Sequence, residues 1–543
     1  MKGDGVLILR SMFRGLRNAY EHVATFFEST VVFLQRRYTP LGRFTPGPFE
    51  GWEFLRVPAL LGFLATVMVL VGGSFSDSPY KLNLTGTWFF GEPTSSPNPP
   101  ASQSTLLLAI VFTYGGIVLF TRVWLRLAEI VKLHPGAPHG ALWRIFALWV
   151  LPMVVAPPLL SRDVFSYAAQ GEMVAHHLSP YLYGPFTLGS GPFVSPVDPR
   201  WGNVPAPYGP FFLWVDGAVN RLAHHNQLAT VVGLRLLELA AVVLLGFAIR
   251  LLAMALRRDP SEAFVLGALN PLTIVTLVGG AHNDALMAAL LTLGVALALR
   301  RRLWWASAII GTAAAVKAPA ALGLLFVAWN WRGADVTFRE RLRPLATAGA
   351  VGAAALGLWT WVAGFGFGWI NNLTSNGSVR SWAAPATGVG MLIHYWLKSS
   401  GVTTSLSHLL LVTRLLGFLI ALSFAGYLLW RSERRGWVRS LAVALLVVVL
   451  LGPVVQPWYL AWGIVLLATS YHGREHFWLM VLTAVGPFIG LPGGHMLFVG
   501  LANANLFLVA ATVALLGAVV AVPMGRWTQW SWPEQRDDAV VAV

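Results

Sequence analysis

Long uncharged stretches recur along almost the whole chain, and they limit what it can fold into. Several approach or exceed the roughly 20 residues that a helix needs to cross a bilayer; examples are residues 57–73, 105–120, 237–256 and 440–455. Charged residues occupy 11% of the 543 positions, whereas a soluble protein of this size carries about 25%. The sequence therefore predicts an all-α polytopic integral membrane protein and excludes a soluble one.

The basic residues gather in short segments between the apolar runs. The net charge is +15, and arginines concentrate in the cytoplasmic loops of membrane proteins. We therefore take the clusters to mark the cytoplasmic face, and we expect membrane lipids and no nucleic acid as partners. The absence of cysteine excludes thiolate catalysis and cysteine-ligated zinc. The main clusters lie at residues 10–17, 36–37, 257–258, 300–302, 339–343 and 431–435.

Threading the chain from the cytoplasm predicts about 12 to 14 transmembrane helices in one integral domain. The first 50 residues contain no apolar core ending in a small-residue cleavage site, so they resemble a tail and not a signal peptide. The predicted parts are a basic cytoplasmic N-terminal tail (1–53), a transmembrane domain (54–523) with external loops (161–228 and 366–406), and a cytoplasmic C-terminal tail (524–543).

The apolar segment 303–331 carries basic residues at both ends, so both ends should be cytoplasmic. It must then turn back at Lys317-Ala318-Pro319, where proline interrupts the helix. Each arm reaches about 20 Å at 1.5 Å per residue, short of the bilayer core of about 30 Å. Lys317 would lie at the tip of this hairpin, either reaching the interface or acting as a counter-charge for an anion such as phosphate.

The stretch SRDVFSYAAQG (161–171) begins where the span 145–160 reaches the outer face. Phe165, Ala169 and Met173 are spaced to form one apolar helix face, which predicts an amphipathic helix lying on the outer leaflet. Such a helix would hold Asp163 above the headgroups. The alternative is that Arg162 and Asp163 only anchor or cap the loop.

GGAHND places His282, Asn283 and Asp284 at the mouth of another span. One histidine and one aspartate two positions apart make a weak metal motif, so we expect no metal and no cofactor. These residues better suit hydrogen bonding to sugar hydroxyls or orienting a base. The histidine doublets at 176–177 and 224–225 are expected to be interfacial polar residues.

Four motifs occur in a specific order: SRDVFSYAAQG, APYGP (206–210), GGAHNDALM (279–287) and VKAP (316–319). Together they resemble the GT-C glycosyltransferases of mycolic-acid-bearing actinobacteria that use polyprenyl-phosphate mannose. The likeness runs from about residue 50 to 520. It is greatest to the α-1,6-mannosyltransferases of lipomannan and lipoarabinomannan core synthesis, the MptB-like branch.

The resemblance implies a plasma-membrane mannosyltransferase with an extracytoplasmic active site, polyprenyl-phosphate mannose as donor and a lipid-anchored α-1,6-mannan as acceptor. In that family the acidic residue at the start of the first external loop is taken as the base, and it corresponds to Asp163. Displacement of a β-linked lipid phosphate by a hydroxyl inverts the anomeric centre, and it needs a proton acceptor and cations. Lys317 and Arg380 are the expected cations. The other expected substrate-binding residues are Arg162, Tyr167, Gln170, Tyr208, His282, Asn283, Asp284, Gln456, Trp458 and Tyr459.

Two other functions remain open at this stage. A lipid-linked sugar flippase or other transporter would also carry broken spans and a lysine within a hairpin. No internal repeat supports it, however, and the polar residues gather on one face. A sister GT-C enzyme with a pentose donor differs only in the shape of its pocket.

Overall fold

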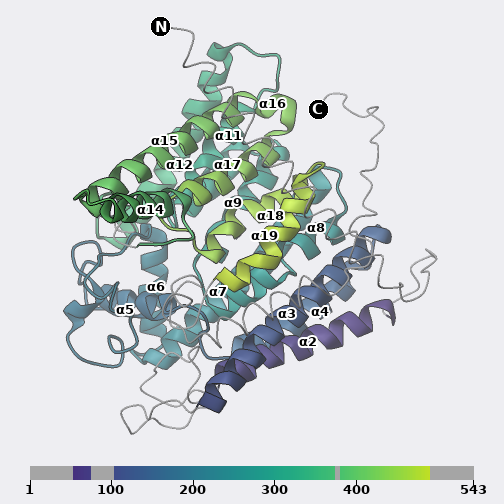
Figure 1. Ribbon diagram of the computed structural model, residues 1–543. Coiled ribbons are helices and arrows are strands. Elements are labelled where there is room, and N and C mark those ends of the chain that lie inside the picture. The colour runs from purple at the N-terminus through teal and green to yellow at the C-terminus, as the bar shows by residue number, and fades with distance from the viewer. Residues whose placement is uncertain (1–52, 75–102, 374–379, 490–543) are drawn as a thin grey trace. The chain divides into compact units, whose positions relative to one another are not determined.

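The structure is a computed structural model that describes residues 53–74, 103–373 and 380–489. All of these lie in one compact unit, Pro48–Asn505. The described residues form helices and connecting loops, without a strand (Figure 1). The all-α prediction is confirmed. The predicted tails, apart from Glu53, and residues 490–523 of the predicted transmembrane domain lie outside the described residues.

Three N-terminal helices pack into one layer, at the lower right of Figure 1. Glycine allows their close approach, because Gly116 on α3 lies against the backbone of Ala65 on α2. Gly62 likewise leaves room for the ring of Trp149 on α4, whose indole N–H donates to the Ala59 carbonyl at 3.0 Å. The helices are α2 (Glu53–Ser74), α3 (Gln103–Leu133) and α4 (His139–Val155).

The central helices are largely buried within the protein. One predicted span here is broken: α8 and the π-helix η2 meet at 54°, where Pro271 cannot donate a backbone hydrogen bond. Asn270 stabilises the break by donating to the Leu266 carbonyl at 3.0 Å and accepting from the Thr273 N–H at 2.8 Å. The helices are α7 (Gln227–Ala255), α8 (Pro260–Gly267), η2 (Leu272–Gly279), α9 (Asp284–Leu299) and α18 (Ala461–Ser470).

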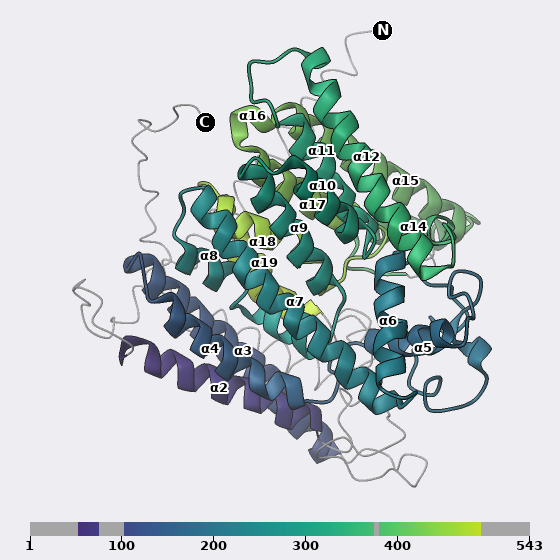
Figure 2. The same cartoon turned by 180° about the vertical axis from the view of Figure 1, so that it is seen from behind.

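The predicted hairpin is confirmed. The Arg301 guanidinium donates to the Trp331 carbonyl at 2.6 Å, so both ends of the segment meet. Gly323 in the second arm lies against Ile310 in the first. Figure 2 shows the first arm beside α9 and α12. The parts are α10 (Leu303–Ala314), the 3₁₀ turn η3 (Ala318–Ala321) and α11 (Leu322–Trp329).

A third group of helices includes several that expose apolar side chains. On α15, Leu411, Leu415 and Phe418 are all more than half exposed, as suits a helix in contact with lipid. The larger members are α12 (Phe338–Ala363), α14 (Pro385–Ser399), α15 (Leu406–Trp430), α17 (Trp437–Leu451) and α19 (Glu475–Ile489). The short ones are α13 (Trp369–Asn372), α16 (Ser432–Arg435) and η5 (Pro457–Leu460).

Four helices of the described part are long and apolar enough to cross a bilayer, and the bent pair would make five. Six other apolar helices have only 10–17 residues, because breaks such as Lys317–Pro319 and Pro453–Pro457 divide the longer runs. The polytopic character is thus confirmed. The total of 12 to 14 spans stays a prediction, since one of them lies outside the described residues.

The loop 161–228 forms helices α5 (Asp163–Ala175), η1 (Pro185–Leu188) and α6 (Pro210–Leu222). The predicted helix is present and begins at Asp163, but the prediction that its polar side chains face water is wrong. Ser166 and Gln170, which should face water, are as buried as Phe165. The reason is α6, which packs closely on α5 because Gly171 has no side chain to hold it off the Asp216 backbone.

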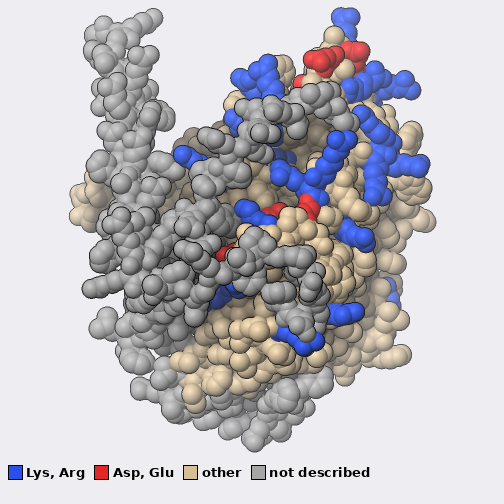
Figure 3. Space-filling model, turned by 90° about the vertical axis from the view of Figure 1, so that its right-hand side faces the viewer, with Lys and Arg blue, Asp and Glu red and all other residues tan. Residues whose placement is uncertain are grey.

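Several basic clusters lie together at one end of the bundle. Arg341 forms an ion pair with Glu433 and donates to the Trp329 carbonyl at 2.5 Å, which joins the clusters 339–343 and 431–435. The hairpin contact of Arg301 brings in the cluster 300–302. Figure 3 shows most Lys and Arg side chains over the upper part of the face in view.

Candidate active site

Asp163 is the first residue of α5. Its side chain faces His282, which lies in the loop between η2 and α9. The distance from Asp163 Oδ2 to His282 Nε2 is 3.7 Å, and the two side chains are 20% and 1% exposed. Burial raises the pKa of Asp163, although His282 and Lys317 oppose the rise. Burial also lowers the pKa of His282, so the imidazole is favoured in its neutral form.

The imidazole is fixed in one orientation. His282 Nδ1 lies 2.6 Å from the Thr276 carbonyl oxygen, and a carbonyl can only accept, so the neutral ring carries its hydrogen on Nδ1. One face of the imidazole ring stacks on Trp458, with the two ring centroids 3.6 Å apart. Nε2 therefore turns a lone pair toward Asp163, and two proton acceptors face the same point. A hydroxyl carries one proton, so at that point it can donate to either acceptor but not to both.

A buried ion pair lies beside these two residues. Lys317 Nζ donates to both carboxylate oxygens of Asp284 at 2.9 Å and to Asn283 Oδ1 at 3.3 Å. Asp284 is fully buried, and the Lys317 side chain is 11% exposed. The Trp462 indole also donates to Asp284 Oδ1 at 2.6 Å. Asp284 is thus saturated by its own neighbours.

Aromatic rings surround the lysine. Its Nζ lies 4.5 Å from the centroid of the Tyr459 ring and 5.6 Å from those of Tyr208 and Trp462. Cation–π contacts of this kind stabilise a cation that is cut off from water. The Lys317 ammonium is therefore held in place both by its hydrogen bonds and by these three rings.

APYGP and VKAP are joined through the backbone. The Gly209 N–H donates to the Val316 carbonyl at 3.0 Å and the Phe211 N–H to the Ala315 carbonyl at 2.9 Å. Gly209 has no room for a side chain against Ala315, which explains this glycine. The motif thereby sets Tyr208 between Lys317 and Tyr167, whose ring meets it edge-on at 5.2 Å.

Arg235 on α7 positions both sides of the site. Its guanidinium donates to the Val154 carbonyl at 3.2 Å, to the Ala156 carbonyl, and to the Gly279 carbonyl at 3.0 Å. It thus fixes the chain that leads into Asp163 and the chain that leads into His282. Arg235 was not among the residues predicted from the sequence. A buried arginine within an apolar span was the available signal.

Arg162 directly precedes Asp163, whereas Gln170 is buried about two turns further along α5. Arg162 is near enough to Asp198 for its charge to act on that carboxylate. Asp198 in turn holds Arg200, with 3.0 Å between Arg200 Nε and Asp198 Oδ1. The pKa of Arg200 is raised by this hydrogen bond, and the charge of Asp163 adds to the effect. Arg200 is therefore a cation near Asp163 that the sequence analysis did not select.

Arg380 and Gln456 lie at the margin. Arg380 is exposed and close enough to Arg414 for the two charges to interact. Arg414 Nε donates to Thr387 Oγ1 at 2.9 Å, and Thr387 donates to the Pro453 carbonyl at 2.6 Å. This series of hydrogen bonds ends at Pro453, three residues before Gln456. Gln456 is half-buried at the start of η5. The role of Arg380 stays a prediction.

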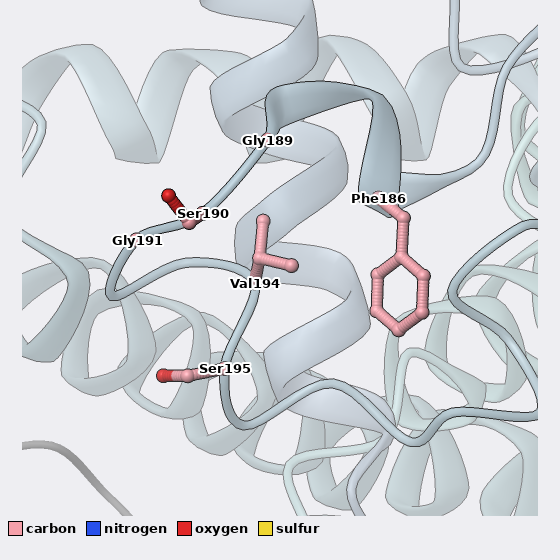
Figure 4. Close-up of a pocket in the computed structure, with 6 residues that line it drawn as sticks. All are labelled: Phe186, Gly189, Ser190, Gly191, Val194 and Ser195. Carbon is pink, nitrogen blue, oxygen red and sulfur yellow. The ribbon is translucent and has the colours of Figure 1, made fainter.

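A shallow pocket opens in the loop 186–195 (Figure 4). Its lining consists of one phenylalanine, one valine, two glycines and two serines, without a titratable side chain: Phe186, Gly189, Ser190, Gly191, Val194 and Ser195. It cannot supply a base or a cation. It contributes none of the titratable groups gathered around Asp163 and Lys317.

Comparison with known proteins identifies the family. The N-terminal domain of the alpha-(1->6)-mannopyranosyltransferase family matches residues 59–333. The C-terminal domain of MptB matches residues 386–525. The chain belongs to the alpha-(1->6)-mannopyranosyltransferase family. It is thus a glycosyltransferase, as the resemblance implied.

Curated relatives cover most of this glycosyltransferase. Alpha-(1->6)-mannopyranosyltransferase A of Mycobacterium tuberculosis is 30% identical, over 85% of this chain and 89% of its own length. A second alpha-(1->6)-mannopyranosyltransferase of that organism is 34% identical, over 82% and 84%. Alpha-(1->6)-mannopyranosyltransferase B of Corynebacterium glutamicum is 32% identical, over 91% and 85%. No solved structure matches.

The family matches cover both halves of the site. Asp163, His282 and Lys317 fall within the N-terminal match, and Trp458 with its neighbours falls within the C-terminal match. Arg380 lies between the two matched ranges. The residues that this glycosyltransferase brings together therefore come from two family domains, whereas Arg380 belongs to neither.

Proposed function

We propose that this enzyme transfers mannose from polyprenyl-phosphate mannose to a lipid-anchored α-1,6-mannan in lipomannan and lipoarabinomannan core synthesis. The observation that carries the proposal is a pair of proton acceptors, Asp163 and His282, that face the same point. Their acceptor atoms lie 3.7 Å from each other. A chain of this family needs such a point for the attacking hydroxyl. The names of the relatives specify mannose and the α-1,6 linkage.

The reaction is a single displacement. The acceptor hydroxyl oxygen forms the bond to the anomeric carbon of mannose while the bond from that carbon to the phosphate oxygen breaks. The lipid phosphate leaves with the electron pair, and the hydroxyl proton goes to Asp163. A β-linked donor then yields an α product with inversion. General-base catalysis of this type contributes about 10²–10⁴-fold to the rate.

His282 is a positioning residue in this scheme. Its Nε2 lone pair faces the Asp163 carboxylate, and the hydrogen bond to Thr276 holds the ring in that orientation. A hydroxyl between the two acceptors is then aligned before it reacts. Alignment matters because attack geometry tolerates displacements of only about 1 Å.

The departing phosphate requires positive charge, and Lys317 and Arg380 are proposed to supply it. Lys317 is already bonded to Asp284, so a phosphate oxygen would replace its longest contact, the 3.3 Å bond to Asn283. Asp284 then keeps the ammonium in place and does not itself accept the proton. Arg162 and Arg200, which lie close to Asp163 and Asp198, add positive charge nearby.

The proposed orientation is extracytoplasmic. Helix α9 runs from Asp284 to Leu299, so the site and the arginines 300–302 occupy opposite ends of it. Helix α18 likewise runs from the site to Tyr471, whose carbonyl accepts from Arg258 at 3.0 Å. Because basic loops face the cytoplasm, the site would face the extracytoplasmic side. A lipid-borne sugar donor suits that side, because it requires no nucleotide sugar.

The test is direct transfer. Purified protein is incubated with labelled polyprenyl-phosphate mannose and a short α-1,6-mannoside, without nucleotide sugar, and the linkage of the product is analysed. An elongated α-1,6 product that is lost in Asp163→Asn supports the proposal. Movement of the lipid-linked sugar across liposomes without a new glycosidic bond would instead indicate a transporter. Transfer from a pentose donor alone would indicate the sister activity.

A further inference from the structure

Two of the histidines that the sequence analysis placed at the interface meet at the far end of α5. Glu172 Oε1 lies 2.9 Å from His176 Nε2, and Glu172 Oε2 lies 2.9 Å from His225 Nδ1. The three ligand atoms all lie within 4.8 Å of one another. In the part of the chain that the structure describes, this is the one such group of three or more possible metal ligands.

We propose that Glu172, His176 and His225 form a structural zinc site. Two imidazole nitrogens and one carboxylate are ligands that zinc accepts, with a water in the fourth position. Calcium and magnesium prefer an all-oxygen set. Glu172 and His176 are separated by four residues at the end of one helix, which places both side chains on the same face.

The site is open to solvent from the histidine side. The side chains of His176 and His225 are 56% and 45% exposed, whereas Glu172 is 13% exposed. A metal ion can therefore reach the imidazoles directly, while the carboxylate is largely buried. The two imidazole rings lie only 5.4 Å apart between centroids, so a small adjustment of either ring brings both nitrogens to one ion.

The backbone that delivers His225 is in an unfavourable conformation. His225 has φ of 57°, and the preceding His224 has φ of 50°, in the left-handed region that disfavours residues other than glycine. His177, next to His176, also has φ of 57°. Such positions persist when their surroundings stabilise them, and they occur often at ligand sites.

The ion would join two helix ends. Glu172 and His176 belong to the end of α5, whereas His225 lies between α6 and α7. Nine residues separate Glu172 from Asp163, about 13 Å along the helix, so the ion is too far away to act on the reacting atoms. Its effect would be to hold the helix that begins with Asp163.

Zinc binding is the test. Detergent-purified protein is stripped with a chelator and titrated with Zn²⁺ alone, and bound metal is counted by mass spectrometry. We expect about one zinc per chain and a zinc-dependent rise in the unfolding temperature. His225→Asn and Glu172→Gln should weaken binding by about 100-fold or more, since even outer contacts are worth 10–100-fold.

The neighbouring histidine supplies the matched control. His224→Asn alters an adjacent residue with the same backbone conformation but no ligand contact, so it should bind zinc like the wild type. Asparagine tolerates φ above zero, which keeps the loop intact in both variants. Each variant is compared with itself with and without zinc, so a general loss of stability cancels.

Two outcomes would overturn the site. The first is wild-type protein that holds no more zinc than His225→Asn, which would reduce the cluster to a glutamate hydrogen-bonded to two histidines. The second is zinc binding with unchanged affinity in both His225→Asn and Glu172→Gln, which would place the ion elsewhere on the chain. Mg²⁺ and Ca²⁺ titrations run alongside should give no comparable stabilisation.

Discussion

The ion pair between Lys317 and Asp284 permits a sharp test of what the lysine does. Lys317→Met keeps the length and apolar body of the side chain but removes its charge. The variant leaves Asp284, which is fully buried, with a single indole hydrogen bond from Trp462 in place of its ion pair. A buried carboxylate without its counter-charge destabilises the folded state strongly.

The magnitude follows from the geometry. At the separation of 2.9 Å, two unit charges attract by about 6 kcal/mol for an effective dielectric constant of about 20. Desolvation offsets much of this, and removing one partner of a buried pair costs about 3–5 kcal/mol. Lys317→Met should therefore lower the free energy of unfolding by about that amount. Asp284→Asn leaves a buried ammonium and should also be destabilising.

The double variant Lys317→Met/Asp284→Asn tests whether the two charges stabilise the fold as a pair. It removes both charges, while the asparagine oxygen can still accept from Trp462. Most of the lost stability should return, and the interaction energy of the cycle should exceed about 1 kcal/mol, above the deviation of about 0.5 kcal/mol seen for independent sites. Unfolding is followed by tryptophan fluorescence in a detergent that permits refolding.

The same double variant separates structure from donor binding. If Lys317 also contacts the lipid phosphate, the refolded double variant should show a raised donor KM, because the cation is gone although the fold is restored. Additive losses in the two single variants, without rescue in the double variant, would refute the argument that the pair acts as a structural unit. An unchanged donor KM in the double variant would remove Lys317 from phosphate binding.

Four further predictions concern the base, its support and the topology. Asp163→Asn should reduce turnover at least about 100-fold, with donor binding retained. In the wild type, burial raises the pKa of Asp163. As the pH is lowered, activity should therefore be lost at a higher pH than it would be with an ordinary carboxyl group as the base. His282→Ala should lower kcat more than it changes donor KM and should shift that acidic limb, whereas unaltered kcat would show that the imidazole has no positioning role. Arg235→Met should destabilise the protein by about 1–3 kcal/mol, since it leaves buried carbonyl groups unpaired, and thermal unfolding measures this. A cysteine at the exposed Ser190 should react with a membrane-impermeant thiol reagent in spheroplasts and one at the exposed Arg434 should not; the opposite pattern would invert the topology.

The sequence predicted those features that follow from local rules. The hairpin was predictable because basic residues at both ends of an apolar run require an even number of crossings, and the Lys317–Pro319 break offered one place to turn. The grouping of the motifs was predictable only from the resemblance to a family. Nothing local shows that APYGP and VKAP share backbone hydrogen bonds, because more than 100 residues separate them.

Other features could not be predicted from local patterns. The apolar face of α5 is compatible with lipid or with protein, and the small residue Gly171 that admits α6 gives no signal by itself. The partner of Lys317 is 33 residues away, on a helix whose position depends on the whole bundle. Arg235 and His225 were visible as polar residues, but their contacts with Gly279 and Glu172 depend on the tertiary fold.

The geometry also distinguishes the three carboxylates that were candidates for the proposed base. Asp284 accepts two bonds from Lys317 and one from Trp462 and is fully buried, so a hydroxyl would have to displace these donors to reach it. Glu172 lies about 13 Å from Asp163 along α5 and is engaged by two histidines. Asp163 differs from both: its side chain is 20% exposed, and its carboxylate, hydrogen-bonded by the Ser161 side chain, faces the acceptor nitrogen of His282. Of these three acids, Asp163 therefore has both access and free lone pairs for a proton, and the buried ion pair beside it explains why a second carboxylate can be present without competing.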